Sequence, residues 1–250
     1  MKPNHKKMLK SGRLVRDTFH YLTPFVKVGI TTSALDLLAY EYMIRHGGIP
    51  APLGYSIGGL PPFPKSICTS SNAVAAHGIP RESEELVEGD IISIDISLSI
   101  DGHFADACKT YMVGEVSEEA SFLVRATKTI HELLIEYASD NHRNLMTGDI
   151  GAYTEVLCDK FGLYPIPGCG GHGIGTSLHL PPFVPPNSDG GEGVRIKQGS
   201  YFTIEPLIAI KQTDLVTAPD RWTMVSPQGV LIAQEEHTLY LGVDGLEILT

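Results

Sequence analysis

The stretch Gly89-Asp-Ile-Ile-Ser-Ile-Asp95 matches a later stretch, Gly199-Ser-Tyr-Phe-Thr-Ile-Glu205, position by position. Each has a turn glycine followed by an apolar strand that ends in a carboxylate. A histidine before a proline-containing turn precedes each stretch, His77 in one case and His179 in the other. We interpret the match as a weak internal duplication of a helix-plus-hairpin unit. Two such units folded face to face would bring Asp95 and Glu205 together at a pseudo-twofold axis.

The rest of the chain predicts both helices and strands, and its length is compatible with a single domain, residues 1–250. Helical spacing of apolar residues and capping signals predict helices at 7–24, from a Ser33/Asp36 capping box to Gly47, from Ser117 to about Ser139, and from Thr147 to Gly162. The expected strands are near 66–70, at 90–98 and 103–113 as a hairpin, and at 200–209, 222–226, 229–234 and 236–242. Residues 51–64 and 181–193 are expected to be loops rich in proline and glycine.

Asp95 lies in a strand that we expect to be buried on both faces, because isoleucines flank it on either side. Asp101-Gly102 is a favoured turn dipeptide and joins this strand to the one that carries Asp106. The two carboxylates can therefore meet across a hairpin on one face. An exposed carboxylate on a solvated face is the alternative. It conflicts with the isoleucines around Asp95 and stays open for Asp106, whose neighbours are small and polar.

Three further segments offer metal ligands. His172 lies in Gly170-Gly-His172-Gly-Ile-Gly175, where glycines would let the backbone approach a ligand closely, although a histidine in a flexible loop is an alternative. Glu205 ends an apolar strand, where an unpaired glutamate would be costly to bury. Glu235 and Glu236 are adjacent and face opposite sides of a strand. Only one of them can reach the site, and the residues alone leave the choice open.

Four carboxylates and one imidazole in apolar or glycine-rich surroundings predict a site for two divalent cations. Two such ions can share a hydroxide, lower its pKa and polarise a carbonyl, which is metal-assisted hydrolysis of an amide or ester. His77 and His179 are candidates for proton transfer and for hydrogen bonding to an oxyanion, although a lone histidine is more often structural. No G-x-S-x-G motif and no obvious cysteine–histidine pair favours a nucleophilic mechanism.

Composition excludes several other classes of protein. The formal net charge of -10 argues against a nucleic-acid-binding protein. The four cysteines form no close pair, so neither a thiolate zinc site nor a redox motif is indicated. No secretory apolar region follows the basic start, and no apolar stretch reaches membrane-spanning length. We expect a soluble cytoplasmic protein that binds neither DNA nor membrane.

The motifs above resemble those of the methionine aminopeptidases over nearly the whole chain. They are Ala76-His77-Gly-Ile-Pro80, Gly89-Asp-Ile-Ile-Ser-Ile-Asp95, Asp106, Gly171-His172-Gly-Ile-Gly175, Phe202-Thr-Ile-Glu205-Pro206 and Glu236-His237-Thr238. The resemblance implies the pita-bread fold, in which two related α+β halves form a curved antiparallel sheet around a dimetal site. It also implies removal of the initiator methionine from nascent proteins when the second residue is small. A hydroxide that bridges the two metals would attack the first peptide bond.

By the same resemblance, the fifth ligand is Glu236, and Glu235 faces away. The implied set is Asp95 on one metal, Asp106 and Glu236 bridging both, and His172 with Glu205 on the other. The ions would be two divalent cations, Co, Mn, Fe, Ni or Zn. Glu205 would also accept the proton of the attacking water. His77 would contact the scissile amide and assist the leaving group, and His179 would stabilise the oxyanion.

The short separation of Glu205 and Glu236 resembles type I enzymes, because type II enzymes carry a long helical insertion there. The lack of an amino-terminal extension in this sequence resembles the short bacterial form. The candidates for the methionine pocket are Tyr55, Phe63, Cys68, Leu178 and Trp222. The segment 52–64 carries extra residues and Leu178 replaces a usual aromatic, which implies an altered pocket shape.

Two alternatives to this function stay open. One is an Xaa-Pro aminopeptidase or dipeptidase of the same superfamily, and the other is a non-catalytic peptide-binding relative. The expected partners are the N-termini of nascent polypeptides, with transient contact to the ribosome, and the protein is expected to be a monomer.

Overall fold

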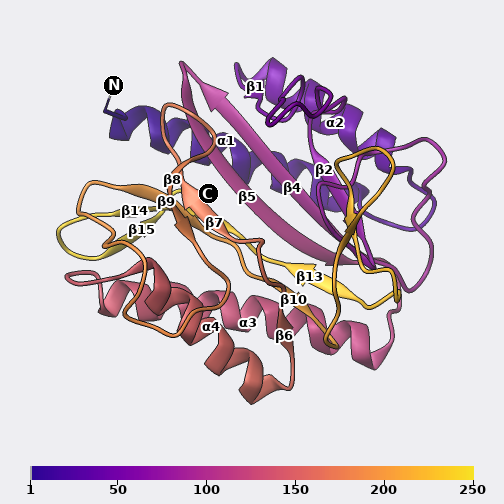
Figure 1. The fold of residues 1–250 in the computed structure, drawn as a ribbon. Helices are drawn as coiled ribbons and strands as arrows, with labels where there is room; N and C mark the ends of the chain where they lie inside the picture. The colour runs from indigo at the N-terminus through magenta and orange to yellow at the C-terminus, as the bar shows by residue number, and fades with distance from the viewer. Residues whose placement is uncertain (1) are drawn as a thin grey trace.

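The computed structural model describes residues 2–250 as a layered arrangement of helices and antiparallel strands (Figure 1). The helices are α1 (His5–Leu22), the short 3-10 helix η1 (Thr23–Phe25), α2 (Thr32–Arg45), α3 (Glu118–Asp140) and α4 (Thr147–Phe161). The strands of the first half are β1 (Ile49–Pro50), β2 (Cys68–Ser71), β3 (Val74–Ala76), β4 (Ile91–Ile100) and β5 (His103–Met112). Those of the second half are β6 (Tyr164–Pro165), β7 (Gly171–Gly173), β8 (Leu180–Val184), β9 (Tyr201–Ile204), β10 (Leu207–Ala209), β11 (Val216–Thr217), β12 (Met224–Val225), β13 (Ile232–Gln234), β14 (His237–Leu241) and β15 (Leu246–Ile248).

The predicted hairpin is confirmed and is the longest strand pair of the described chain. Strands β4 and β5 pair from Ile91 opposite Met112 to Ile100 opposite His103. Asp101 and Gly102 have φ angles of 49° and 70°, as a two-residue type I′ turn requires. The turn dipeptide therefore sets the register that decides which side chains of the two strands share a face.

Two large apolar cores divide the molecule into halves. One joins α1 and α2 to the β4–β5 hairpin, with Leu35 and Ile94 fully buried between them. The other joins α3 and α4 to β9, β13 and β14 around Leu123 and Phe202. In Figure 1, α1 and α2 lie at the top, α3 and α4 lie along the bottom, and the strands run between them. This division agrees with the predicted duplication of a helix-plus-hairpin unit.

The two halves meet where β5 lies beside the chain that leads from β13 into β14. The Glu236 N–H donates to the Cys108 carbonyl at 2.9 Å. The Asp106 N–H donates to Thr238 Oγ1 at 2.8 Å, and Thr110 Oγ1 donates to the Gln234 carbonyl at 2.7 Å. This seam brings the carboxylate-bearing strands of both halves together.

The predicted capping box of α2 is wrong. The helix is capped by Thr31, whose hydroxyl accepts from the Ala34 N–H at 3.2 Å, so Ser33 lies inside the first turn. The Asp36 carboxylate instead accepts from the Ser66 N–H at 2.7 Å and from the Ile67 N–H at 3.2 Å. The Asp36 side chain, which the local sequence had assigned to the helix cap, therefore makes tertiary hydrogen bonds just before β2 instead.

Two other boundaries differ from expectation. The predicted strand 200–209 is split into β9 and β10 at Glu205-Pro206, because proline has no N–H to donate to a neighbouring strand. The predicted loop 181–193 begins with strand β8, which pairs with β7. No helix among residues 2–250 is both long and apolar enough to cross a membrane.

Candidate metal centre and adjoining cavity

Asp95 and Asp106 project from the same face of the β4–β5 hairpin. Asp95 lies opposite Cys108 and Asp106 opposite Ser97, so the two aspartates are diagonal neighbours across the pair. Asp106 is only 5% exposed, which rules out the solvated alternative that its small, polar neighbours had left open. The Ser97 hydroxyl donates to Asp106 Oδ1 at 2.8 Å. Sequence reasoning missed Ser97, although it stands two residues from Asp95 and therefore on the same face.

Glu205 and Glu236 come from the second half of the molecule. Glu205 lies between β9 and β10, and Glu236 lies between β13 and β14, the strands that pair with β10 and β9. Glu205 follows β9 and Glu236 precedes β14, whose first residue pairs with the last residue of β9. Two side chains that the sequence reasoning missed hold the Glu205 carboxylate. Thr203 Oγ1 donates to Oε1 at 2.7 Å, and Gln234 Nε2 lies 3.3 Å from Oε2. Thr203 shares the face of Glu205 by strand alternation, whereas Gln234 is brought in by a separate strand.

The structure places Glu236 in the cluster and Glu235 outside it. Glu236 is 2% exposed, and Asp106, Glu205 and Asp95 are its charged neighbours. Glu235 Oε1 accepts from the Thr110 N–H at 3.3 Å, and its charged neighbours are Lys109, Lys128 and Glu132. Strand alternation thus separates the two adjacent glutamates, and the surroundings of each show which one faces the other carboxylates.

His172 presents one ring nitrogen to these carboxylates. Its Nδ1 lies 3.0 Å from the Gly173 carbonyl, which can only accept, so Nδ1 carries the hydrogen and Nε2 keeps its lone pair. Nε2 lies 3.5 Å from Glu205 Oε1 and 3.8 Å from Asp106 Oδ2. A backbone hydrogen bond that fixes the tautomer in this way is typical of histidine ligands to metals.

The glycines beside His172 lie against the backbone of neighbouring strands. A Cβ on Gly171 would lie 2.3 Å from the Thr203 carbonyl oxygen, and one on Gly173 would lie 2.3 Å from the Pro181 carbonyl oxygen. The glycines therefore let β7 pack closely between its neighbouring strands. His172 lies in a strand that β8 and β9 hold on either side, not in a free loop.

The carboxylates repel one another in a buried place. Burial and the neighbouring charge of Asp106 raise the pKa of Asp95 well above its usual value. Burial, followed by the charges of Asp106, Glu205 and Asp95, raises the pKa of Glu236 in the same way. Burial raises the pKa of Glu205 to about 7, while His172 opposes the shift. A cluster that resists ionisation on its own becomes stable in its ionised form when cations supply the missing positive charge.

The donor set fits metal ions by two further observations. One ligand atom from each of Asp106, His172 and Glu236 lies within 4.8 Å of the others. Asp95 Oδ1 and Glu236 Oε1 are buried and have no hydrogen-bond partner among residues 2–250. A buried polar atom without a partner costs about 1–3 kcal/mol, and more if it is charged. Oxygens aimed into a cluster of carboxylates are the atoms that a divalent cation would satisfy.

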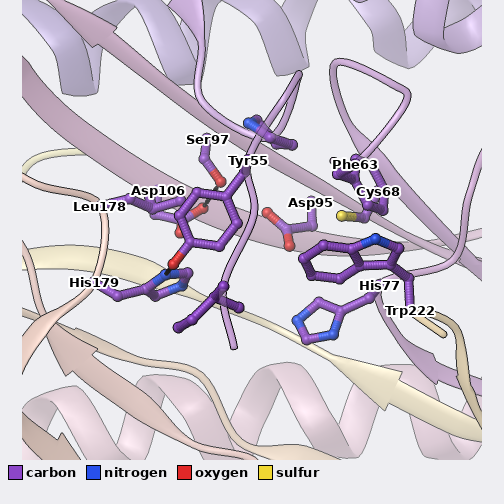
Figure 2. Close-up of a pocket in the computed structure, with 12 residues that line it drawn as sticks. Tyr55, Phe63, Cys68, His77, Asp95, Ser97, Asp106, Leu178, His179 and Trp222 are labelled. Carbon is purple, nitrogen blue, oxygen red and sulfur yellow. Dashed lines mark hydrogen bonds between the residues drawn. The ribbon is translucent and has the colours of Figure 1, made fainter. Parts of the chain in front are cut away.

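A cavity of about 300 Å³ opens beside the cluster (Figure 2). All five predicted pocket residues line it, together with Asp95, Asp106 and both predicted histidines. The full lining is Pro52, Tyr55, Ile57, Phe63, Cys68, His77, Asp95, Ser97, Asp106, Leu178, His179 and Trp222. Pro52 and Ile57 were not predicted, although they belong to the same segment, 52–64, as the predicted Tyr55 and Phe63.

One end of the cavity is apolar and is lined by the buried side chains of Phe63, Cys68 and Trp222, and we call it the closed end. Phe63 and Trp222 meet edge to face with ring centroids 5.5 Å apart, and Cys68 packs beside them. Figure 2 shows this group on one side of Asp95, with Asp106, His179 and Leu178 on the other side. The cavity therefore joins an aromatic and sulfur-lined end to a charged end.

The two histidines flank the carboxylates within this cavity. His77 has a left-handed φ of 55° and meets the Trp222 ring edge to face at 6.2 Å. His179 Nδ1 lies 2.7 Å from the Tyr55 hydroxyl, and its ring meets His172 edge to face at 4.4 Å. Burial lowers the pKa of His77, and burial with the charge of His172 lowers the pKa of His179 to about 4. Both rings are thus neutral near pH 7.

Comparison with known proteins agrees with this site. Residues 6–241 match the family model of Metallopeptidase family M24. Methionine aminopeptidase A of Synechocystis sp. is 39% identical over 245 residues, which are 98% of this chain and 94% of that protein. The methionine aminopeptidase of Clostridium acetobutylicum is 36% identical and covers 97% of this chain, aligned over 94% of its own length. The solved structure of a methionine aminopeptidase from Rickettsia prowazekii has a TM-score of 0.92 at 34% identity, covering 100% and 99% of the two chains.

More distant structures show the fold alone. An Xaa-Pro dipeptidase from Bacillus anthracis has a TM-score of 0.75 at 18% identity, and the match covers 98% of this chain but 59% of the dipeptidase. These likenesses confirm the α+β pita-bread fold that the resemblance had implied. Because the family model matches residues 6–241, nearly the whole chain, this chain belongs to metallopeptidase family M24.

Proposed function

We propose that this protein is a methionine aminopeptidase, which removes the initiator methionine from new proteins when their second residue is small. One observation carries the proposal. A buried carboxylate cluster, with two oxygens that have no hydrogen-bond partner within residues 2–250, adjoins a cavity that is also lined by buried aromatic and sulfur-containing side chains. The similarity of the whole chain to methionine aminopeptidases supports the same conclusion.

The ligands in this proposal are the five residues of the cluster, namely Asp95, Asp106, His172, Glu205 and Glu236. When bound, two divalent cations would supply Lewis acidity for the substrate carbonyl and acidify a water molecule. Four carboxylates and one imidazole suit borderline and hard ions, so Co, Mn, Fe, Ni and Zn are the candidates. The two orphaned oxygens and the mutual repulsion of the carboxylates support this occupancy.

Glu205 is the proposed proton acceptor. Its carboxylate is held at both oxygens, by Thr203 on one side and Gln234 on the other, so it is already oriented before substrate arrives. In the metal-free protein burial raises the pKa of Glu205 to about 7. Bound cations would favour its ionised form, which is the form that can accept a proton as general base.

The two neutral histidines are proposed to donate hydrogen bonds to the substrate. If the Tyr55 hydroxyl donates to His179 Nδ1, the hydrogen of the neutral ring is on Nε2, where it can stabilise an oxyanion. His77 lines the same cavity beside Trp222 and is proposed to contact the scissile amide and assist the leaving amine. A histidine with a lowered pKa remains neutral and keeps one donor and one acceptor for these tasks.

The closed end of the cavity is proposed to take the methionine side chain. Phe63, Cys68 and Trp222 offer an apolar surface, and a thioether makes favourable contacts with aromatic rings. A free amino terminus would be required, because the closed end leaves room for one side chain and no preceding residue. The corresponding partners are the N-termini of nascent polypeptides, and we propose that they are processed in the cytoplasm by a monomeric enzyme. Contact with the ribosome remains a prediction.

The test is hydrolysis of Met-Ala-Ser and of Xaa-Pro peptides by protein stripped with a chelator and reloaded with each candidate ion. We expect the reloaded protein to cleave Met-Ala-Ser faster than any Xaa-Pro peptide, and the stripped protein to cleave neither. Faster cleavage of Xaa-Pro peptides would reverse the assignment. Failure to take up Co or Mn would favour a non-catalytic relative.

A further inference from the structure

A tight turn forms part of the cavity wall. The Gly54 N–H donates to the Phe63 carbonyl and the Phe63 N–H donates to the Tyr55 carbonyl, both at 2.8 Å, so residues 56–62 are an excursion with joined ends. Within it, the Leu60 N–H donates to the Ile57 carbonyl at 2.9 Å. Gly58 and Gly59 have φ angles of 57° and 76°, the pattern of a type I′ turn. Residues 56–62, here called the wall turn, therefore have a defined conformation.

The two apolar residues at the base of this turn face different surroundings. Leu60 packs against the cluster formed by Phe63, Cys68 and Trp222. Ile57 lines the cavity and is nevertheless 53% exposed, which places it at the mouth rather than at the closed end. A rigid turn thus holds a branched apolar side chain at the opening of the cavity.

A second segment holds the wall turn from outside. Arg221 Nη2 donates to the Gly59 carbonyl at 3.3 Å, and Trp222 Nε1 donates to the Pro61 carbonyl at 2.9 Å. The Asp220 carboxylate accepts from the Trp222 N–H at 2.9 Å and from Arg81 at 2.7 Å, which fixes the segment that carries both donors. Two adjacent side chains therefore bind two carbonyls of the same turn.

The backbone of Arg221 is strained. Its φ is 69°, a left-handed conformation that glycine adopts freely and that a residue with a Cβ adopts at a cost. Strain that is kept in a native structure points to a use for the side chain that causes it. The Arg221 side chain donates a hydrogen bond to the wall turn at the Gly59 carbonyl.

We propose that Ile57 is a specificity-determining residue for the second residue of the substrate, and that Arg221 is the positioning residue that holds it there. This inference rests on the proposed function. With methionine at the closed end and its carbonyl at the carboxylates, the rest of the peptide must leave through the mouth, where Ile57 stands. A fixed branched side chain at this place leaves room for alanine or glycine and collides with valine or leucine at the second position.

The experiment compares kcat/KM for Met-Val-Ser with kcat/KM for Met-Ala-Ser in the wild-type enzyme and in Ile57→Ala. We expect the ratio to rise by about tenfold in Ile57→Ala, since a small difference in apolar volume in a binding site changes specificity by roughly 10–200-fold. The matched control is Ile44→Ala, an isoleucine with 46% exposure on α2 that does not line the cavity, for which the ratio should not change.

Arg221→Gly tests the positioning role separately. Glycine relieves the left-handed strain, so the melting temperature should not fall, while loss of the bond to Gly59 should raise the same ratio. A lower ratio or an unchanged one, in a folded Arg221→Gly protein, would overturn the role of Arg221.

The outcomes separate this inference from the proposed function. An unchanged ratio in Ile57→Ala, with a wild-type enzyme active on Met-Ala-Ser, would refute the role of Ile57 and leave the aminopeptidase intact. A wild-type enzyme that cleaves no Met-initiated peptide would refute the proposed function and this inference together.

Discussion

Replacing Thr203 by valine should destabilise the protein, although the two side chains have nearly the same shape. Thr203 is fully buried, and its hydroxyl makes two hydrogen bonds. It accepts from the His172 N–H at 2.9 Å and donates to Glu205 Oε1 at 2.7 Å. Valine fills the space but can make neither bond. The change therefore leaves a buried N–H unpaired and removes one donor from a carboxylate.

The magnitude follows from these two losses. An unsatisfied buried donor costs about 1–3 kcal/mol, and a hydrogen bond to a charged group contributes about 1.5–3 kcal/mol. Partial relaxation and the mixed protonation of Glu205 near pH 7 reduce the sum. We expect the free energy of unfolding of the metal-free protein to fall by about 3 kcal/mol. Because Thr203 orients Glu205 and His172, metal affinity should fall by about 10–100-fold as well.

A matched control lies in α3. Thr127 is also fully buried, but its hydroxyl has no hydrogen-bond partner in the part of the chain that the structure describes. Thr127→Val removes an unpaired polar atom, so stability should stay the same or rise by about 1 kcal/mol. Both variants are measured by guanidinium chloride unfolding of stripped protein and by calorimetric titration with Mn. Equal losses of stability in the two variants, or undiminished metal affinity in Thr203→Val, would refute the reasoning.

Three other outcomes are expected. Asp106→Ala should abolish activity by removing a proposed metal ligand. His77→Ala should lower kcat by about 10²–10⁴-fold without loss of metal binding. Normal turnover in Asp106→Ala, read in a peptide assay with metal analysis, would contradict the ligand assignment. Removal of the metals should lower the melting temperature, because ions at 100 times their dissociation constant add about 2.7 kcal/mol to stability. Calorimetry with and without a chelator measures this difference. An unchanged melting temperature would count against the metal site. Burial lowers the pKa of His131 to about 3, so between this value and about pH 6.5 the unfolded chain binds a proton that the folded chain does not. The contribution of His131 to stability is therefore complete above about pH 6.5. It declines by about 1.4 kcal/mol per pH unit as the pH falls towards 3. Urea unfolding at pH 7 and pH 5 should show a smaller decline in His131→Gln than in the wild type, and equal declines would exclude His131 as a cause.

Short-range patterns were enough to predict the hairpin and the helices. The Asp101-Gly102 turn, the Ser117 cap of α3 and the Gly162 end of α4 depend on the conformations of a few adjacent residues, and all three are present. The capping box at Ser33 failed for the opposite reason. Asp36 is satisfied by backbone groups about thirty residues away, and no local signal reports such a partner.

The chemistry of the candidate centre also follows from the chain itself. Carboxylates within apolar strands are costly to bury unless cations compensate their charge. Asp95, Asp106, His172 and Glu205 could therefore be proposed as ligands before any coordinates, whereas the residues alone left Glu235 and Glu236 as alternatives for the fifth. Strand alternation also places Ser97 on the face of Asp95 and Thr203 on the face of Glu205, but these two residues were overlooked.

The residues and their spacing left open which of two adjacent glutamates faces the cluster; the resemblance implied Glu236, and the tertiary structure places Glu236 there. The lining of the cavity was likewise decided by the tertiary structure. Glu235 and Glu236 differ in their surroundings, which strands from the two halves supply. Gln234 reaches Glu205, Arg221 reaches Gly59, and Ile57 stands at the mouth because separate segments meet there. The free-energy cost of burying a polar group can be inferred from its neighbours in the sequence. The groups that offset this cost come from distant segments, and only the packing of the folded chain determines which they are.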